Sequence, residues 1–419
     1  MRLATDKSPK LTVPYRYLFT GIGVLVILST AIVLKAEAFT VPPYGSTVLL
    51  PLTHLLTLGW ITMTIVGAMF QLVPVITEKD LYSETIAKMV FYIYLAGIAW
   101  LVYSFAVSKP SEIGAGIVSI ALILFIIDSF MTMRGMKVAD LAVWYVVAGM
   151  CFLCLTLLTG SFAAYGMHHI VTYNSFDLLF LHVALAGIGW VCFVVIGFSL
   201  RLIPMFILSH GYKESYGWAS FVTLIFGLVF VILYFLLHML IPQIKGIHWI
   251  ELSGGFLMLI GIISYILQMR IIYKQRTRHH IEPAIWFSIC ATGYLFVSGV
   301  AGVWMIMFRH SFRIDIAYVI TGLFGFAGMY IIGMMHKIVP FLQWYNKYSS
   351  KIGLEKVPKT KDMINEPLTW IQLFVFNAGL IALLAGVISN MAIMITISGV
   401  ILLIGSTMFV WNMITVLRR

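Results

Sequence analysis

Histidine is the residue type in this sequence whose placement points most directly to chemistry. The chain has eleven histidines, and His54, His182 and His238 are among those that stand inside long apolar stretches. A neutral imidazole is a good ligand for heme iron and for copper. Because burying an unpaired imidazole among apolar groups is costly, a histidine in such a stretch needs a hydrogen-bond partner or a metal. These three residues are therefore candidate ligands of a heme or a metal ion.

The stretches that carry these histidines have the length and composition of membrane-spanning helices. Of the 419 residues, 61% are hydrophobic and only 10% are charged, which excludes an ordinary soluble domain. Runs of about 20 apolar residues, enough to cross about 30 Å of hydrocarbon, recur along the whole chain. The twelve predicted spans are residues 16–36, 47–76, 85–107, 112–133, 140–165, 177–208, 217–241, 249–272, 284–308, 314–341, 368–389 and 391–416. The sequence thus predicts an all-α polytopic protein with twelve transmembrane helices in a lipid bilayer.

Lysines and arginines are unevenly distributed between the predicted loops. If the N-terminus is cytoplasmic, 21 of the 27 fall in cytoplasmic segments, as the positive-inside rule requires. The sequence therefore predicts a multi-pass protein of the cell membrane with both termini in the cytoplasm. Its net charge of +11 is explained by this asymmetry and by attraction to anionic lipid. We expect no nucleic-acid partner.

A sequence pattern recurs in the second, sixth and tenth spans. The three copies are GWITMTIVGAMFQLVP at 59–74, GWVCFVVIGFSLRLIP at 189–204 and GFAGMYIIGMMHKIVP at 325–340. Each has a glycine and an aromatic residue, a second glycine and a final proline at the same spacing, and the copies stand four spans apart. This period predicts three pseudo-repeats of four transmembrane helices. The frequency of glycine and proline in membrane helices is the weaker explanation.

Twelve helices in three units of four, with a cytoplasmic N-terminus, resemble the catalytic subunit, subunit I, of the heme-copper oxidase superfamily. The resemblance covers the whole chain as one membrane domain, residues 1–419. Its most specific local part is THLLTLGWITMTIVGAMFQLVPV at 53–75, which is similar to helix 2 of bacterial nitric oxide reductases and the related C-type oxidases. The resemblance implies b-type heme, with copper or non-heme iron as a second metal, and oxidoreductase chemistry in respiratory electron transport.

The resemblance also implies ligand roles for individual histidines. His54 matches the helix 2 histidine that ligates the low-spin heme, and His182 matches the helix 6 histidine that ligates the active-site copper or non-heme iron. His238 stands where oxidases carry an adjacent pair of histidines, although here it stands alone. His168 or His169, after the fifth span, could supply the missing ligand. Ordinary solvated loop residues are the slightly favoured alternative for that pair.

The tenth span departs from the family pattern. It reads RHSFRIDIAYVITG at 309–322, so that Asp315 and Ala317 stand where the family has a His-x-His pair, one ligand for each heme. Arg309 and Arg313 are suited to the carboxylates of heme propionates, and Tyr318 is a candidate neighbour of the heme. Loop charges and an interfacial tyrosine are the alternative readings of these three residues.

These observations favour a heme-binding membrane redox protein that binds or acts on nitric oxide or oxygen. Its electrons would come from a quinol or a cytochrome. The NnrS family of heme- and copper-containing membrane proteins is a close variant, since it has a pattern like LHVALAGIGW at 181–190, but its His-Ala-His-Glu-Met stretch is absent. The departure in the tenth span leaves two further classes open. One is a metal or heme transporter, and the other is a catalytically inactive oxidase-like protein that acts in assembly or sensing.

Overall fold

The computed structural model contains twelve helical stretches that are long and apolar enough to cross a membrane, one at each position expected from the sequence. It describes residues 7, 9–43, 46–136, 140–171, 174–241, 243, 246–308 and 310–419, and no β-strand occurs among them. The helices are α1 (Thr12–Leu34), α2 (Leu49–His54), α3 (Met63–Thr77), α4 (Glu84–Ala106), α5 (Glu112–Met133), α6 (Leu141–Gly166), α7 (Ser175–Ala184), α8 (Phe193–Ile207), α9 (Ser215–Leu240), α10 (His248–Lys274), α11 (Pro283–Met307), α12 (Phe312–Val319), α13 (Met329–Tyr348), α14 (Glu366–Ser389) and α15 (Ala392–Arg418). The predicted all-α, multi-pass fold is confirmed.

The second, sixth and tenth spans are each interrupted by a π-helical segment. These segments, Leu55–Thr62, Leu185–Cys192 and Ile320–Gly328, join α2 to α3, α7 to α8 and α12 to α13. Each contains the first glycine and the aromatic residue of the recurring sequence pattern. Because π-helical turns are rare and are frequently found at functional sites, these segments mark the three spans as the part of the fold to search for a site.

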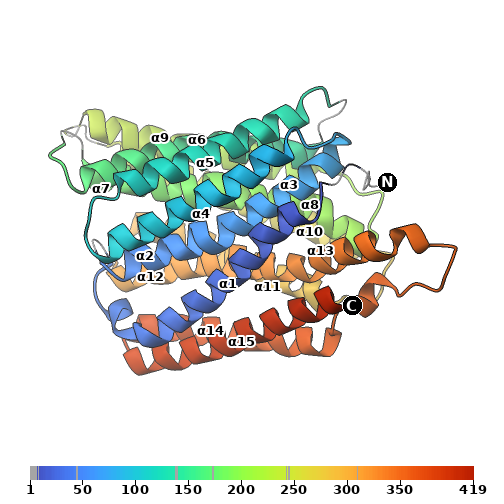
Figure 1. Cartoon of the computed structure of the whole chain (residues 1–419). Coiled ribbons are helices and arrows are strands. Elements are labelled where there is room, and N and C mark those ends of the chain that lie inside the picture. Colours follow the sequence, from blue (N-terminus) through green and yellow to red (C-terminus); the bar gives the residue numbers. More distant parts are fainter. Residues whose placement is uncertain are drawn as a thin grey trace. The chain divides into compact units, whose positions relative to one another are not determined.

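The chain forms two compact units. Unit 1 comprises Met1–Lys88, Ile281–Ala291 and Phe312–Arg419. In it, α15 packs against α1, α13 and α14, and the two π-helical segments of the unit contact each other (Figure 1). The Gln343 side chain bonds both the Tyr15 hydroxyl and the Leu417 carbonyl, so the start of α1 and the end of α15 lie at the same end of this unit.

Unit 2 comprises Met89–His280 and Thr292–Ser311. Within it, α6 packs against α5, α7 and α8, while α9 packs along α10 and also contacts α7 (Figure 1). Its α6 begins at a capping aspartate, because the Asp140 carboxylate accepts a hydrogen bond from the Val143 amide. Such a cap satisfies one of the backbone donors left over at a helix start.

The second glycine of the recurring pattern marks a close helix contact in all three spans. In each case a Cβ added to the glycine would lie 2.4–2.7 Å from the Cβ of an aromatic residue on the odd-numbered span just before it. The contacts are Gly67 with Tyr17, Gly197 with Tyr145 and Gly333 with Phe287. Only a residue without a side chain permits this approach, which fixes how each pair of consecutive spans packs.

The residue three positions before the final proline of the recurring pattern also has a similar environment in two of the three spans. Arg201 binds Asp140 at 2.7 Å, just before α6, and Lys337 binds Glu282, just before α11. Both acids precede the first residue of the odd-numbered span that packs on the glycine. In the second span the same position holds Gln71, which is buried and uncharged. The ion pair therefore recurs in two of the three places.

The tenth span is longer than its apolar run predicts. The sequence places its end near residue 341, whereas α13 continues to Tyr348. In the second and sixth spans the chain leaves the helix four residues after the proline, at Glu78 and Leu208, which have left-handed backbone conformations. In α13 the helix continues past Pro340, and the indole of Trp344 donates to the Pro358 carbonyl at 2.6 Å, holding the extra turns against the following segment.

Candidate functional site

His54 is the last residue of α2 and directly precedes a π-helical segment. Its Nδ1 lies 2.9 Å from the carbonyl oxygen of Leu50, one helical turn earlier. Since a carbonyl can only accept, Nδ1 carries the proton and the lone pair of the neutral ring is on Nε2. Histidines that bind metals usually have this arrangement, in which one ring nitrogen donates to a carbonyl and the other faces the metal.

Two buried polar atoms lie farther along the same span. Nε1 of Trp60 and Oγ1 of Thr64 are inaccessible to solvent and have no hydrogen-bond partner within the described part of the chain. The indole nitrogen faces the tenth span, where a Cβ on Gly328 would lie 3.6 Å from it. A buried donor without an acceptor is uncommon in native proteins. The second span therefore carries an imidazole and, farther along, two polar atoms that the described part of the chain leaves unsatisfied.

The residues proposed on the tenth span lie on or beside α12, also in unit 1. Arg313 is half-buried, with its guanidinium 6.0 Å from the centre of the Phe312 ring, and Tyr318 is half-buried two residues before the π-helical segment. Arg309 lies outside the described residues. At the two positions where the family has histidines, Ala317 is buried and Asp315 half-buried. Neither of these two positions holds an imidazole.

His182 is held by the neighbouring helix α6 in unit 2. Its Nδ1 lies 3.1 Å from the Thr156 carbonyl and 3.4 Å from the Thr159 hydroxyl. The ring lies against Gly160, where an added Cβ would approach Cε1 to 2.7 Å. The carbonyl contact again fixes the proton on Nδ1 and the lone pair on Nε2. His182 and His54 therefore both carry the ring proton on Nδ1, which is a common tautomer of metal-binding histidines.

His238, on α9, is paired with a carboxylate. Its Nδ1 lies 2.7 Å from Oδ2 of Asp177 on α7, and its ring stacks on that of Tyr234. Asp177 is buried, whereas the His238 side chain is about one-third exposed. His238 and Asp177 are 61 positions apart in sequence, and their contact connects α9 to α7. Holding these two helices together is therefore a sufficient role for His238.

Replacing His238 with alanine is expected to destabilise the protein while leaving its heme content unchanged. The Asp177 carboxylate would lose its partner, and an unsatisfied buried acceptor costs about 1–3 kcal/mol. The thermal unfolding midpoint and the heme-to-protein ratio measure the two effects. Asp177→Asn is the matched control, because the amide still offers an oxygen to the ring. A stable His238→Ala protein without heme would contradict this prediction.

His168 and His169, after α6, lie on the surface of unit 2. Nε2 of His169 donates to Oε1 of Glu112 at 2.8 Å, and the His169 ring stacks on that of Tyr165 with centroids 4.1 Å apart. Across the described residues, no three histidine, cysteine, aspartate or glutamate side chains are grouped so as to hold a metal ion. The described geometry therefore brings together no copper or non-heme iron site from His182, His238 and this pair.

Sequence reasoning missed several polar residues that the structure places in the interior. They include Trp60 and Thr64, whose polar atoms are unsatisfied, and His336, which is 2% exposed on α13. The position three residues before the proline gave a signal, since it holds a polar residue, glutamine, arginine or lysine, in otherwise apolar helices. His336 stands next to that position, where the other two copies have Phe70 and Leu200, so the repeat gave no signal for it.

Comparison with known proteins adds no identification. No protein-family model matches the chain, and no curated protein matches it. The fold and the residues described above therefore carry the functional argument.

Proposed function

We propose that the chain is a heme-binding membrane protein organised, like subunit I of the heme-copper oxidases, as three repeats of four helices in one domain. Three equivalent π-helical segments and three equivalent glycine contacts support this organisation. So do the ion pairs Arg201–Asp140 and Lys337–Glu282, which occupy equivalent places. Independent helices would have no reason to share these features at matched positions.

Two features support the heme assignment: the resemblance of residues 53–75 to the heme-ligating helix of the oxidase family, and the hydrogen bond from His54 to the Leu50 carbonyl, which puts the ring proton on Nδ1. We propose His54 as an axial ligand of a b-type heme, whose iron supplies redox chemistry and the binding of a diatomic gas. The Trp60 N–H, buried on the same span, would donate to an acceptor of the bound group. Arg313 and Tyr318 are proposed neighbours of the heme, because a guanidinium suits the carboxylates of heme propionates.

Nitric oxide or oxygen is the proposed ligand. The His-x-His positions of the tenth span hold Asp315 and Ala317, so a heme bound to His54 would not receive its second axial ligand from there. An iron with one protein ligand keeps a coordination position for a small molecule. A second metal is left out of the proposal, because the described residues hold no group of three side chains suited to one. Electrons would come from a quinol or a cytochrome.

The proposed location is the cell membrane with both termini in the cytoplasm. The start of α1 and the end of α15 lie at the same end of unit 1, which supports both termini being on one side of the membrane. The excess of basic residues in the proposed cytoplasmic segments supports the assignment of that side to the cytoplasm.

Purified protein is expected to show a stoichiometric Soret absorption band, and its reduced form to shift that band when nitric oxide is added. The absorption spectrum and a heme assay against protein concentration measure this directly. An apoprotein reconstituted with heme is the control for cofactor lost during purification. Protein that binds no heme in either form would rule out the proposal and favour the transporter or the inactive relative.

A further inference from the structure

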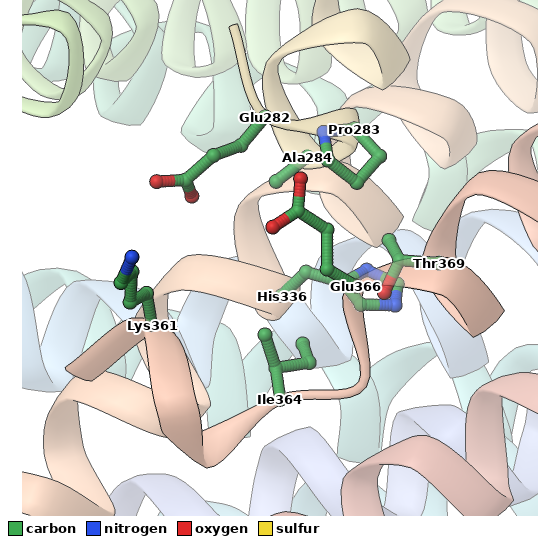
Figure 2. A pocket seen from close by; sticks show the side chains of 8 residues that line it. All are labelled: Glu282, Pro283, Ala284, His336, Lys361, Ile364, Glu366 and Thr369. Atoms are coloured by element: carbon green, nitrogen blue, oxygen red, sulfur yellow. The ribbon is translucent and has the colours of Figure 1, made fainter. Parts of the chain in front are cut away.

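A pocket in unit 1 leads to a buried histidine that the heme proposal does not use. The pocket is lined by Glu282 before α11, by Lys361 and Glu366 near the start of α14, and by His336 and Thr369 (Figure 2). Glu282 and Glu366 are half-buried and Lys361 is exposed, whereas His336 and Thr369 are buried. The charged groups thus lie nearer to water than the imidazole does.

His336 lies deep in the span that carries it. In the recurring pattern, His336 occupies the position that Phe70 has in the second span. Phe70 is 16 residues after His54, which corresponds to about 24 Å along a helix. Its ring is parallel to that of Phe287, with centroids 5.7 Å apart, and its centroid lies 5.1 Å from that of Phe409. The imidazole thus contacts two aromatic rings, and its hydrogen bonds are made by the two nitrogens in the ring plane.

Both ring nitrogens of His336 face oxygen acceptors. Nδ1 lies 2.7 Å from the Ile332 carbonyl, and Nε2 lies 2.9 Å from Oε1 of Gln372 on α14. A neutral imidazole has one N–H and can satisfy only one of these oxygens. The doubly protonated ring satisfies both. The neutral ring requires the Gln372 amide to turn, so that its NH₂ group faces Nε2.

Turning Gln372 has a consequence on a third helix. Its Nε2 now donates to the Gly405 carbonyl on α15 at 3.4 Å. After the turn, Oε1 would face that carbonyl, and two acceptors would oppose each other. The protonation state of His336 is therefore linked to the contact between α14 and α15.

We propose that His336 is a proton-binding site reached through this pocket, and that the side chain of Gln372 rotates when the proton binds. The proton adds to Nε2, whose lone pair becomes an N–H that donates to Gln372 Oε1. Near the ring, the segment before α11 contributes Glu282, which is paired with Lys337, the residue after His336. The α14 side contributes Lys361 and Glu366, and on α15 the ring meets the uncharged Phe409. This site is independent of the proposed heme.

The test is nuclear magnetic resonance of the full-length protein with ¹⁵N-labelled histidine, because ring nitrogen shifts distinguish neutral from doubly protonated imidazole. His336→Gln assigns the signal. Between about pH 8 and about pH 4, the His336 signal is expected to change from neutral, with the proton on Nδ1, to doubly protonated. His210→Gln, at an exposed residue between α8 and α9, is the control and should remove only its own signal.

Two substitutions of Gln372 test the linkage without changing the histidine. Gln372→Leu removes the acceptor, so the protonated fraction at the midpoint pH of the wild type should fall several-fold. Gln372→Glu supplies a carboxylate at the same place and should raise that fraction. A His336 signal that stays neutral over the whole range would overturn the site. Identical titrations in wild type and Gln372→Leu would overturn the role of Gln372.

Discussion

Replacing His54 with alanine is expected to lower the heme-to-protein ratio at least about tenfold, since perturbing even the outer partners of a bound metal commonly costs 10–100-fold in affinity. The wild-type ring donates through Nδ1 to Leu50 and offers Nε2. Alanine offers no ligand, and the neighbouring side chains Leu55 and Leu58 are apolar. The ratio is measured by pyridine hemochrome assay on protein purified from membranes.

Two variants separate ligand loss from misfolding. His54→Met supplies a thioether, which is also an axial ligand of hemes, so we expect partial heme retention with a shifted spectrum. His182→Ala removes a histidine with the same tautomer from unit 2 and should retain the heme. Wild-type heme content in His54→Ala would refute the ligand assignment, and equal loss in His54→Ala and His182→Ala would indicate a general folding defect.

The membrane fold was predictable because the bilayer sets the length of its elements. Each span needs about 20 apolar residues, and that requirement is visible in the sequence whatever the helices pack against. The additional turns of α13 were not visible, because they depend on a contact between Trp344 and the Pro358 carbonyl, 14 positions later in the chain. Boundaries governed by such contacts do not appear in hydropathy.

The environment of the candidate histidines was only partly predictable. The acceptor for His54 is the carbonyl one helical turn earlier, which is local and available to any helical histidine. The partners of His182 and His238, in contrast, are Thr156 and Asp177, which come from other helices 26 and 61 positions away. Sequence spacing identified candidate ligands but did not determine which helix would satisfy each ring.

The π-helical segments show a similar limit. Their positions coincide with the glycine and aromatic pairs that the repeat identified, but a glycine next to an aromatic residue occurs in many ordinary helices. What the repeat provided was equivalence between three places, rather than their backbone conformation. The contacts of the second glycine in each copy make it possible to test whether these three positions hold the helices together.

Introducing alanine at the second glycine of the pattern is expected to be strongly destabilising in all three spans. The clearest case is Gly333, where the new Cβ would lie 2.6 Å from both the Ala284 carbonyl oxygen and the Phe287 Cβ. Optimal carbon contacts are about 3.5–4.0 Å. Neither neighbouring atom can move by side-chain rotation, since one belongs to the backbone and the other is attached to it. The helices must therefore separate by about 1 Å.

We expect Gly333→Ala to lower the free energy of unfolding by at least about 1–3 kcal/mol, the usual cost of an overpacked core, and Gly67→Ala and Gly197→Ala to behave alike. The measurement is reversible unfolding of the purified protein in detergent with increasing dodecyl sulfate. Gly23→Ala on α1 is the matched control, because nothing lies within 4 Å of its Cβ position. It should stabilise by about 0.5–1 kcal/mol, as alanine replaces glycine in a helix. If the three pattern glycines tolerated alanine as well as Gly23 does, the close contacts would not hold the spans together, and the main support for equivalent repeats would be lost.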